Sequence, residues 1–175
     1  MTERRKKFVV DQMHRRLAHW LRILGYDTVF NRDFVDQDFI TIAKEEGRIL
    51  ITRDESLAIR ARKLGIKVIT AIKGKTIEER LVKLAEKTDI SLRIPEDELL
   101  RCTKCNSEIK AIEREKIADR LLPGTKDYHD KFWVCTNDEC QQIFWKGSHW
   151  SQIKESLEKC RKMLEEKKIE NGQSN

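Results

Sequence analysis

Acidic side chains stand at three points where the apolar pattern of the chain changes, and together they could hold a divalent ion. Asp11 follows Phe8-Val9-Val10, and Asp54 closes the stretch Arg48-Ile-Leu-Ile-Thr-Arg-Asp54. Asp36 and Asp38 precede a third apolar face. Mg²⁺ and Mn²⁺ prefer oxygen ligands, and carboxylates that converge on such an ion can activate water against a phosphodiester. These aspartates therefore predict a metal-dependent hydrolytic site.

The same aspartates have a simpler explanation as helix N-caps. Asp11, Asp36 and Asp54 each stand immediately before a predicted helix, where a carboxylate accepts hydrogen bonds from free backbone N–H groups. For one such residue alone, a cap is the better interpretation. Three in succession, on adjacent strand-to-helix loops of a basic protein, favour the metal site.

Four cysteines form a second constellation. Cys102-Thr-Lys-Cys105 and Cys135-Thr-Asn-Asp-Glu-Cys140 are two short pairs separated by a long charged insert. This spacing matches the knuckles of a structural zinc ribbon, in which four thiolates leave no open position for catalysis. Two disulfides are the alternative. Cys160 recurs at helical spacing with other apolar residues, so we expect a small buried hydrophobe there.

Aromatic and cationic side chains surround the second cysteine pair. They are Phe132, Trp133, Phe144, Trp145, Trp150, Lys131, Lys146 and His149. Such a mixture can stack bases and neutralise phosphates, but a small ribbon also needs aromatic residues for its own core. His149 is either a phosphate contact or an ordinary hydrogen-bonded surface residue.

The composition agrees with a polyanionic partner. The 175 residues carry a formal net charge of +6, a surplus that favours nucleic acid as a partner or serves as a solubilising surface. No apolar run approaches the roughly 20 residues that cross a bilayer, and residues 4–7 lead into only three apolar residues, too few for a signal peptide. We therefore expect a cytoplasmic, reducing location, in which paired cysteines bind metal rather than form disulfides.

Alternation of short strands with helices must position the aspartates. Apolar strands are expected at 8–10, 27–30, 48–51 and 67–70, and the helices between them end near Gly25, Gly47 and Gly65, with a further helix from Ile77 to Ala85. This order predicts an α/β fold with a parallel sheet flanked by helices. Ligands bind beyond the carboxyl ends of such strands, where the aspartates should lie.

Further boundaries follow from breaks in this pattern. Residues 1–88 form the predicted sheet domain, and residues 89–101, with Ile94-Pro95, form a linker. The zinc ribbon is expected at 102–150, followed at 151–175 by a C-terminal helix and a tail that is disordered from Asn171 to Asn175.

Several of these stretches together resemble the Mut-7 C-terminal RNase family. The resemblance rests on Phe8-Val-Val-Asp11, Leu17 to Thr28, Asp36 with Ile42-Ala43, Arg48 to Asp54, Arg101 to Asn106, Cys135 to Cys140, and Trp145-Lys-Gly147-Ser-His149. It covers the chain from about Phe8 to Trp150, and the combination is far more specific than any one part.

The resemblance implies a PIN-like nuclease domain fused to a zinc ribbon, with metal-dependent cleavage of single-stranded RNA. Asp11 and Asp54 match the two clearest acids of the family, Asp36 matches the acid ahead of the second helix, and Asp38 stands where another acid is frequent. Thr52 and Arg53 belong to the same motif. A hydroxyl near the metal and a cation near the phosphate are their implied roles, with strand-end packing and solvent exposure as the alternatives.

One departure from the resemblance concerns a fourth acid. PIN-like sites often carry one after a later strand, but Val68-Ile-Thr70 leads into Ala71-Ile-Lys73. Either Asp38 supplies the extra ligand or the site is weak.

Two classes of function therefore remain. The first is a ribonuclease that uses Asp11, Asp36, Asp54 and Asp38 with Mg²⁺ or Mn²⁺. Its expected RNA contacts are Arg22, Arg48, Arg53, Arg101, Lys146, His149 and Trp145. The second is an RNA- or ribosome-associated binding protein with a weak or inactive PIN-like fold. A phosphatase with a strand-end aspartate as nucleophile fits the α/β pattern but has no supporting motif.

Overall fold

A four-stranded parallel sheet forms the centre of the protein. The computed structural model describes residues 6–94 and 99–172. The strands β1 (Phe8–Val10), β2 (Thr28–Val29), β3 (Ile49–Ile51) and β4 (Val68–Ile69) lie in the order β2-β1-β3-β4. Val9 pairs with Leu50, and Leu50 pairs with Val68. The predicted α/β class with a parallel sheet is confirmed.

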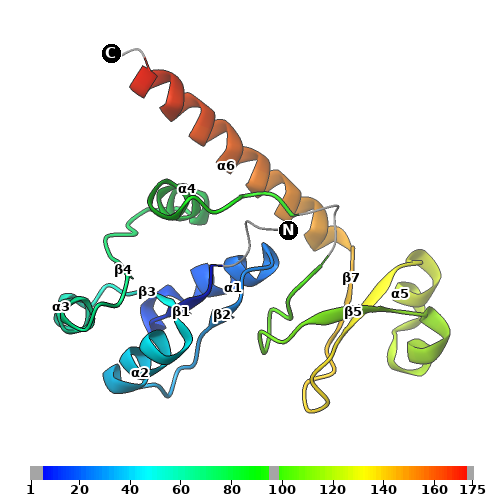
Figure 1. Ribbon diagram of the computed structural model, residues 1–175. Coiled ribbons are helices and arrows are strands. Elements are labelled where there is room, and N and C mark those ends of the chain that lie inside the picture. Colours follow the sequence, from blue (N-terminus) through cyan, green and yellow to red (C-terminus); the bar gives the residue numbers. More distant parts are fainter. Residues whose placement is uncertain (1–5, 95–98, 173–175) are drawn as a thin grey trace.

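Helices cover both faces of this sheet because successive strand residues point to opposite sides. On one face, Phe8 and Val10 pack with α1 (Arg15–Ile23) and α4 (Ile77–Thr88). On the other face, Val9 packs with α2 (Asp36–Glu46) and α3 (Glu55–Lys63). Figure 1 shows α4 on one side of the strands and α2 on the other. We call residues 6–94 the sheet unit.

The helix boundaries follow the sequence signals closely. Gly47 ends α2 in the left-handed region at φ 64°, which glycine adopts without steric cost. The helix expected from Leu17 begins earlier, at Arg15, after a 3₁₀ turn named η2 (Gln12–His14). The η2 turn therefore connects Asp11, which follows β1, to the start of α1.

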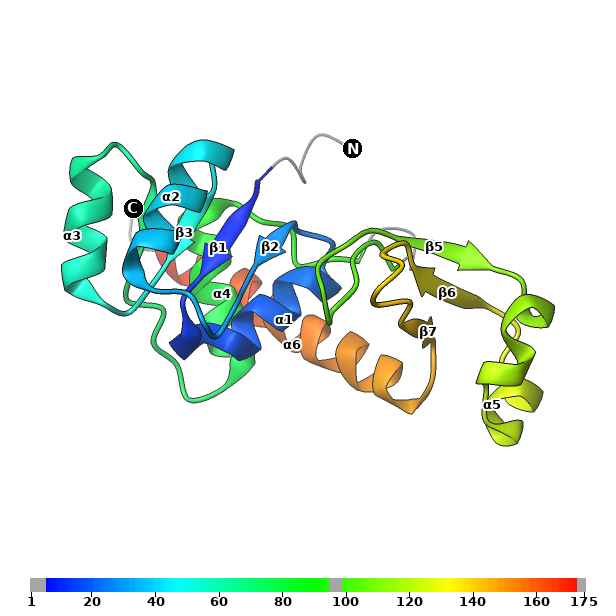
Figure 2. The same ribbon diagram turned by 90° about the horizontal axis from the view of Figure 1, so that it is seen from below.

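A smaller antiparallel sheet carries the cysteines. It consists of β5 (Ile109–Ile112), β6 (Phe132–Cys135) and β7 (Ile143–Trp145), in the order β5-β6-β7. Its core contains Ile117, Phe132, Val134 and Ile143. The long insert forms a 3₁₀ helix, η4 (Arg114–Arg120), and α5 (Pro123–Tyr128). We call residues 99–147 the ribbon unit; Figure 2 shows it extending to one side of the sheet unit.

The last helix returns from the ribbon unit to the sheet unit. Helix α6 (Ser148–Gly172) packs along α4 (Figure 1). It buries Leu157 and Cys160 in the core that α1 and α4 form with Phe8 and Val10, which we call the larger core. Cys160 is thus a buried hydrophobe, as expected. The expectation of disorder from Asn171 onward is wrong for Asn171 and Gly172, which belong to α6, and residues 173–175 lie outside the described residues.

The segment expected to act as a linker also contributes to the larger core. Ile90 and Leu92 are buried there beside α4 and α6, whereas residues 95–98 lie outside the described residues. Within the described ranges, no helix is both long and apolar enough to span a membrane.

Candidate functional site

Asp11 occupies the end of β1 and is 6% exposed. Its Oδ2 accepts hydrogen bonds from Thr52 Oγ1 at 2.6 Å and from the backbone N–H of Arg53 at 2.8 Å. Its Oδ1 accepts from the N–H of Met13 at 3.0 Å, which caps the η2 turn. Three donors therefore hold this carboxylate in one orientation.

Asp54 lies three residues after the end of β3 and has an exposed side chain. Its Oδ1 accepts from the N–H of Leu57 at 3.0 Å and caps α3. Its own backbone N–H donates to Thr52 Oγ1 at 3.0 Å. Because Val10 and Ile51 are paired in the sheet, the two strand ends are adjacent, and the Thr52 hydroxyl connects both aspartates.

Asp36 and Asp38 lie in the first turn of α2. Asp36 forms an ion pair with Arg60 of α3 at 3.2 Å, and both side chains are almost half exposed. Asp38 accepts from the N–H of Val35 at 2.8 Å and so stabilises the start of the helix. Gln12 ties the preceding loop to the η2 turn by donating to the carbonyls of residues 32 and 34. All four aspartates thus lie along the carboxyl edge of the parallel strands.

The cap interpretation of the aspartates therefore finds support in the local geometry of two of them. Asp11 and Asp54 do cap helical turns, whereas Asp36 makes no cap and pairs with Arg60. Among the described residues, the acids do not form a group of three with ligand atoms close enough for one ion; the four cysteines do. Ala71, at φ 59°, lies in the loop after β4, where PIN-like sites often carry a fourth acid.

His14 is a residue at this edge that the sequence did not single out. It is 2% exposed, and neither ring nitrogen has a hydrogen-bond partner within the described part of the chain. Burial lowers the pKa of its imidazole; the Asp11 charge raises it, and Arg53 and Arg80 lower it. The net effect is a pKa below the ordinary value of 6.5. A histidine three residues after a strand-end aspartate was the available signal, and it is weak.

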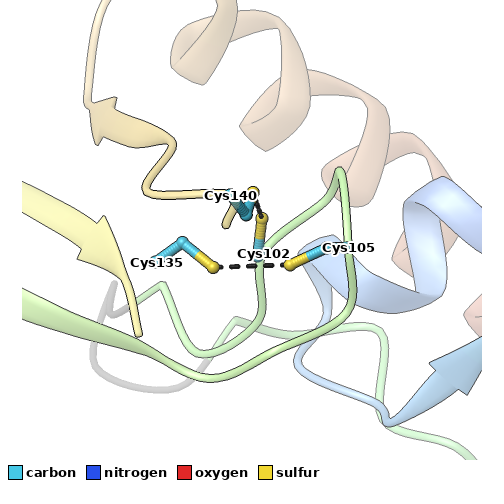
Figure 3. Close-up of side chains that lie close together, drawn as sticks. All are labelled: Cys102, Cys105, Cys135 and Cys140. Atoms are coloured by element: carbon cyan, nitrogen blue, oxygen red, sulfur yellow. Dashed lines mark hydrogen bonds between the residues drawn. The ribbon is translucent and has the colours of Figure 1, made fainter. Parts of the chain in front are cut away.

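The four predicted zinc ligands converge on one point (Figure 3). Cys102 Sγ lies 3.8 Å from Cys140 Sγ, and Cys105 Sγ lies 3.4 Å from Cys135 Sγ. All four sulfurs lie within 4.8 Å of one another. Four thiolates at about 2.3 Å from a tetrahedral zinc ion would be about 3.8 Å apart. The cluster therefore fits a metal ion such as zinc.

The thiols differ in how readily they ionise without a cation. Burial, followed by the neighbouring thiols, raises the pKa of Cys135 to about 12. Burial also acts to raise the pKa of Cys105, but hydrogen bonds from Ser107 outweigh it and lower that pKa to about 6. A bound cation would favour the thiolate form of all four, since thiolates are the metal-ligating species.

Three arginines expected to contact RNA already have partners within the protein, and two of them are buried. Arg22 and Arg48 are 6% and 7% exposed. Arg48 pairs with Asp27 at 2.7 Å and with Glu46 at 2.6 Å. Arg101 donates to the carbonyl of Asn106 at 2.9 Å. The buried guanidinium groups of Arg22 and Arg48 cannot reach a phosphate, so we withdraw both from the set of RNA contacts.

Other predicted contacts remain accessible. Arg53 has an exposed side chain beside Asp54, and His149 is exposed in the first turn of α6. Trp145 is 39% exposed. Lys146 lies over the ring of Trp150 at 4.9 Å and over that of Trp133 at 5.5 Å. Since Trp150 is buried, it belongs to the packing between α6 and the ribbon unit, whereas Trp145 is partly exposed beside the ring of His129.

Comparison with known families identifies the family of the chain. The model of the Mut7-C RNAse domain matches residues 6–157, which include both the sheet unit and all four cysteines. The chain belongs to the Mut7-C RNAse domain family. A search of curated proteins finds no significant match. Membership in the Mut7-C family suggests a nuclease, and its RNase domain implies RNA as the substrate.

Proposed function

We propose that this Mut7-C protein is a metal-dependent ribonuclease that hydrolyses phosphodiester bonds of single-stranded RNA. Asp11, Asp36 and Asp54 would hold Mg²⁺ or Mn²⁺, and Asp38 would be the additional acid. The observation that carries the proposal is the Thr52 hydroxyl, which bonds Asp11 Oδ2 at 2.6 Å and the Asp54 N–H at 3.0 Å. It joins two strand-end acids in one hydrogen-bonded unit, which two independent helix caps would not require.

The chain's own contribution is to orient these groups and to bring in the phosphate. A bound divalent ion would supply an activated water and would neutralise the charge on the leaving oxygen. Three donors orient the Asp11 carboxylate, and the exposed Arg53 extends from the same loop, where a guanidinium can pair with a phosphate. The Asp36 to Arg60 pair is exposed and worth at most about 1 kcal/mol, so Asp36 can exchange partners.

The ribbon unit would bind a part of the RNA that lies beyond the nucleotides at the aspartates. Lys146 and the exposed His149 offer positive charge or hydrogen bonds to phosphates, and the accessible ring of Trp145 offers a surface for base stacking. The guanidinium of Arg101 is bonded to the carbonyl of Asn106 but is partly exposed, so Arg101 would be a secondary phosphate contact. In this arrangement the zinc ribbon aids RNA binding while its metal has a structural role.

The decisive variant is Asp54→Asn, because it separates chemistry from folding. Asparagine is as good an N-cap as aspartate, so α3 keeps its cap to Leu57. In contrast, Asp11→Asn would replace an oxygen that accepts two hydrogen bonds and would destabilise the fold. Cleavage of a labelled single-stranded RNA with Mn²⁺ should fall at least about 100-fold in Asp54→Asn, in the range of a lost catalytic group.

A matched control is Asp33→Asn, which removes one exposed negative charge from the loop before α2. It should cleave at the rate of the unsubstituted protein. Equal cleavage by Asp54→Asn and Asp33→Asn would end the assignment of Asp54 and with it the proposed site.

A second function is favoured by a specific observation. The acids of the described residues do not gather at ion-binding distances, and Ala71 follows β4 where a further acid would be expected. The chain would then be an RNA- or ribosome-associated binding protein that keeps the fold with little activity. RNA binding in that case survives Asp54→Asn and weakens steeply with salt.

Binding to a fluorescent single-stranded RNA, measured between 50 and 300 mM salt, distinguishes the two. Under the binding-protein hypothesis, Lys146→Ala weakens binding and Mn²⁺ never produces fragments. Under the ribonuclease hypothesis, RNA fragments appear when Mn²⁺ is added. They do not appear when a chelator removes the Mn²⁺ under conditions that leave zinc bound to the cysteines.

A further inference from the structure

Arg22 connects the sheet unit to the cysteine centre. It lies on α1, and its Nε donates to the carbonyl of Thr28 at 2.9 Å. Its Nη1 donates to the carbonyls of Thr103 at 3.0 Å and Lys104 at 3.2 Å. Thr103 and Lys104 are the two residues between Cys102 and Cys105, so the guanidinium rests directly on the first cysteine knuckle; Figure 3 shows the ribbon of α1 passing beside this cluster.

The charge of Arg22 lacks a carboxylate in hydrogen-bond contact within the described ranges. A buried cation is costly unless an opposite charge compensates it. The charge of Asp27 acts on Arg22. However, Arg48 already pairs with both oxygens of Asp27, at 2.7 and 3.2 Å, and Asn106 donates to Asp27 at 2.8 Å. Backbone carbonyls satisfy the N–H groups of Arg22 without neutralising its charge.

We propose that Arg22 is the cationic partner of the metal-loaded cysteine centre and thereby couples metal loading of the ribbon unit to the stability of the sheet unit. Four thiolates around one Zn²⁺ carry a net charge of −2. That charge arises a few atoms from the Arg22 guanidinium, in a protein interior where charges interact more strongly than in water. Removing the metal takes away this compensating centre and also the ion that fixes the shape of the knuckle to which Arg22 donates.

The coupling would act on β2, the edge strand of the sheet. The carbonyl of Thr28 accepts from Arg22, and the N–H of Thr28 donates to Asn106 Oδ1 at 2.9 Å. Asn106 follows Cys105 directly, at φ 73°, and its N–H bonds the carbonyl of Cys102 at 2.9 Å. Asn106 at the end of the cysteine knuckle and Arg22, which rests on that knuckle, thus supply the partners of the Thr28 backbone in β2.

The first experiment measures zinc affinity by competition with a chromophoric chelator. Arg22→Met keeps much of the side-chain volume and removes the charge, and it should weaken zinc binding about 10- to 100-fold, the range for outer partners of metal ligands. Arg16→Met is the matched control, because Arg16 lies on the same helix with an exposed side chain; it should leave affinity unchanged. Arg22→Lys keeps the charge and should retain most of the affinity.

A second experiment needs no substitution and so does not depend on whether Arg22→Met folds. Hydrogen exchange of the unsubstituted protein is followed with zinc and after its removal. Amides of residues 28–29 in β2 should exchange faster without zinc, whereas those of 68–69 in β4 should change much less.

Two outcomes overturn the inference. Equal loss of zinc affinity in Arg22→Lys and Arg22→Met would show that charge is not what Arg22 contributes. Unchanged exchange of β2 on zinc removal would show that the two units are not coupled. Neither readout uses RNA cleavage, so both results are independent of the proposed ribonuclease activity.

Discussion

Replacing Thr52 with valine removes the hydroxyl that joins the two strand-end aspartates while keeping the branched side chain of a buried strand end. Thr52 is fully buried. In Thr52→Val, Asp11 Oδ2 loses its 2.6 Å donor and the Asp54 N–H loses its 3.0 Å acceptor. We expect the substitution to lower both the stability of the protein and its RNA cleavage.

The stability loss can be estimated from these two contacts. A hydrogen bond to a carboxylate is worth about 1.5–3 kcal/mol, and one between neutral groups about 1 kcal/mol. The added methyl group of valine returns about 0.8 kcal/mol of apolar burial. The net loss in free energy of unfolding is therefore about 2–3 kcal/mol, measured by urea denaturation at pH 7.

Thr28→Val provides the matched control for this measurement. Thr28 is also fully buried in the parallel sheet, but its hydroxyl donates to the carbonyl of Tyr26 at 3.0 Å and touches neither aspartate. By the same accounting, the lost neutral hydrogen bond is largely offset by burial of the added methyl group, so this variant should lose only about 0.2 kcal/mol. Under conditions where both variants are folded, it should cleave RNA normally. Cleavage by Thr52→Val at the rate of Thr28→Val would refute the view that Thr52 organises a catalytic site.

Two further predictions concern stability. Burial acts to raise the pKa of Asp27, but hydrogen bonds from Arg48 and Asn106 outweigh it and lower the pKa below its ordinary value of 3.8. The ionised Asp27 carboxylate thus stabilises the fold above its ordinary pKa, and this stabilisation is lost as the pH falls through the lower folded-state pKa. Asp27→Asn should therefore lower the free energy of unfolding at pH 7, measured with urea, and the difference from the unsubstituted protein should shrink below about pH 4. Leu157→Ala should cost about 3 kcal/mol in the same assay, because Leu157 is buried between α6 and the sheet unit. An equal cost from Ile169→Ala, on the exposed end of α6, would contradict that account.

Local patterns were sufficient for the order of elements and for the cysteine centre. Continuous apolar runs such as Ile49–Ile51 mark strands covered on both faces, and Gly47 ends α2 because it adopts a positive φ at little cost. The four cysteines were identified by spacing alone, since two short pairs fix the local shape of each metal knuckle.

Spacing did not reveal which charged side chains are free. Arg22 and Arg48 look in the sequence like any other cations of a basic protein, yet one rests on the cysteine knuckle and the other on Asp27. Arg53, in contrast, remains exposed beside the aspartates. A guanidinium has the same local signature in both situations, because its partners come from strands and loops far away along the chain.

The sequence by itself determined the strands, the helices, the four cysteines that could hold a metal ion and the aspartates at the strand ends, because each depends on neighbours within a few residues. Only the tertiary structure decided that Thr52 links Asp11 to Asp54, that His14 is buried without a partner in the described residues, and that α6 returns to α4. These features depend on which strands become adjacent and which apolar faces meet. That choice is made by packing across the whole chain, and the local pattern does not contain it.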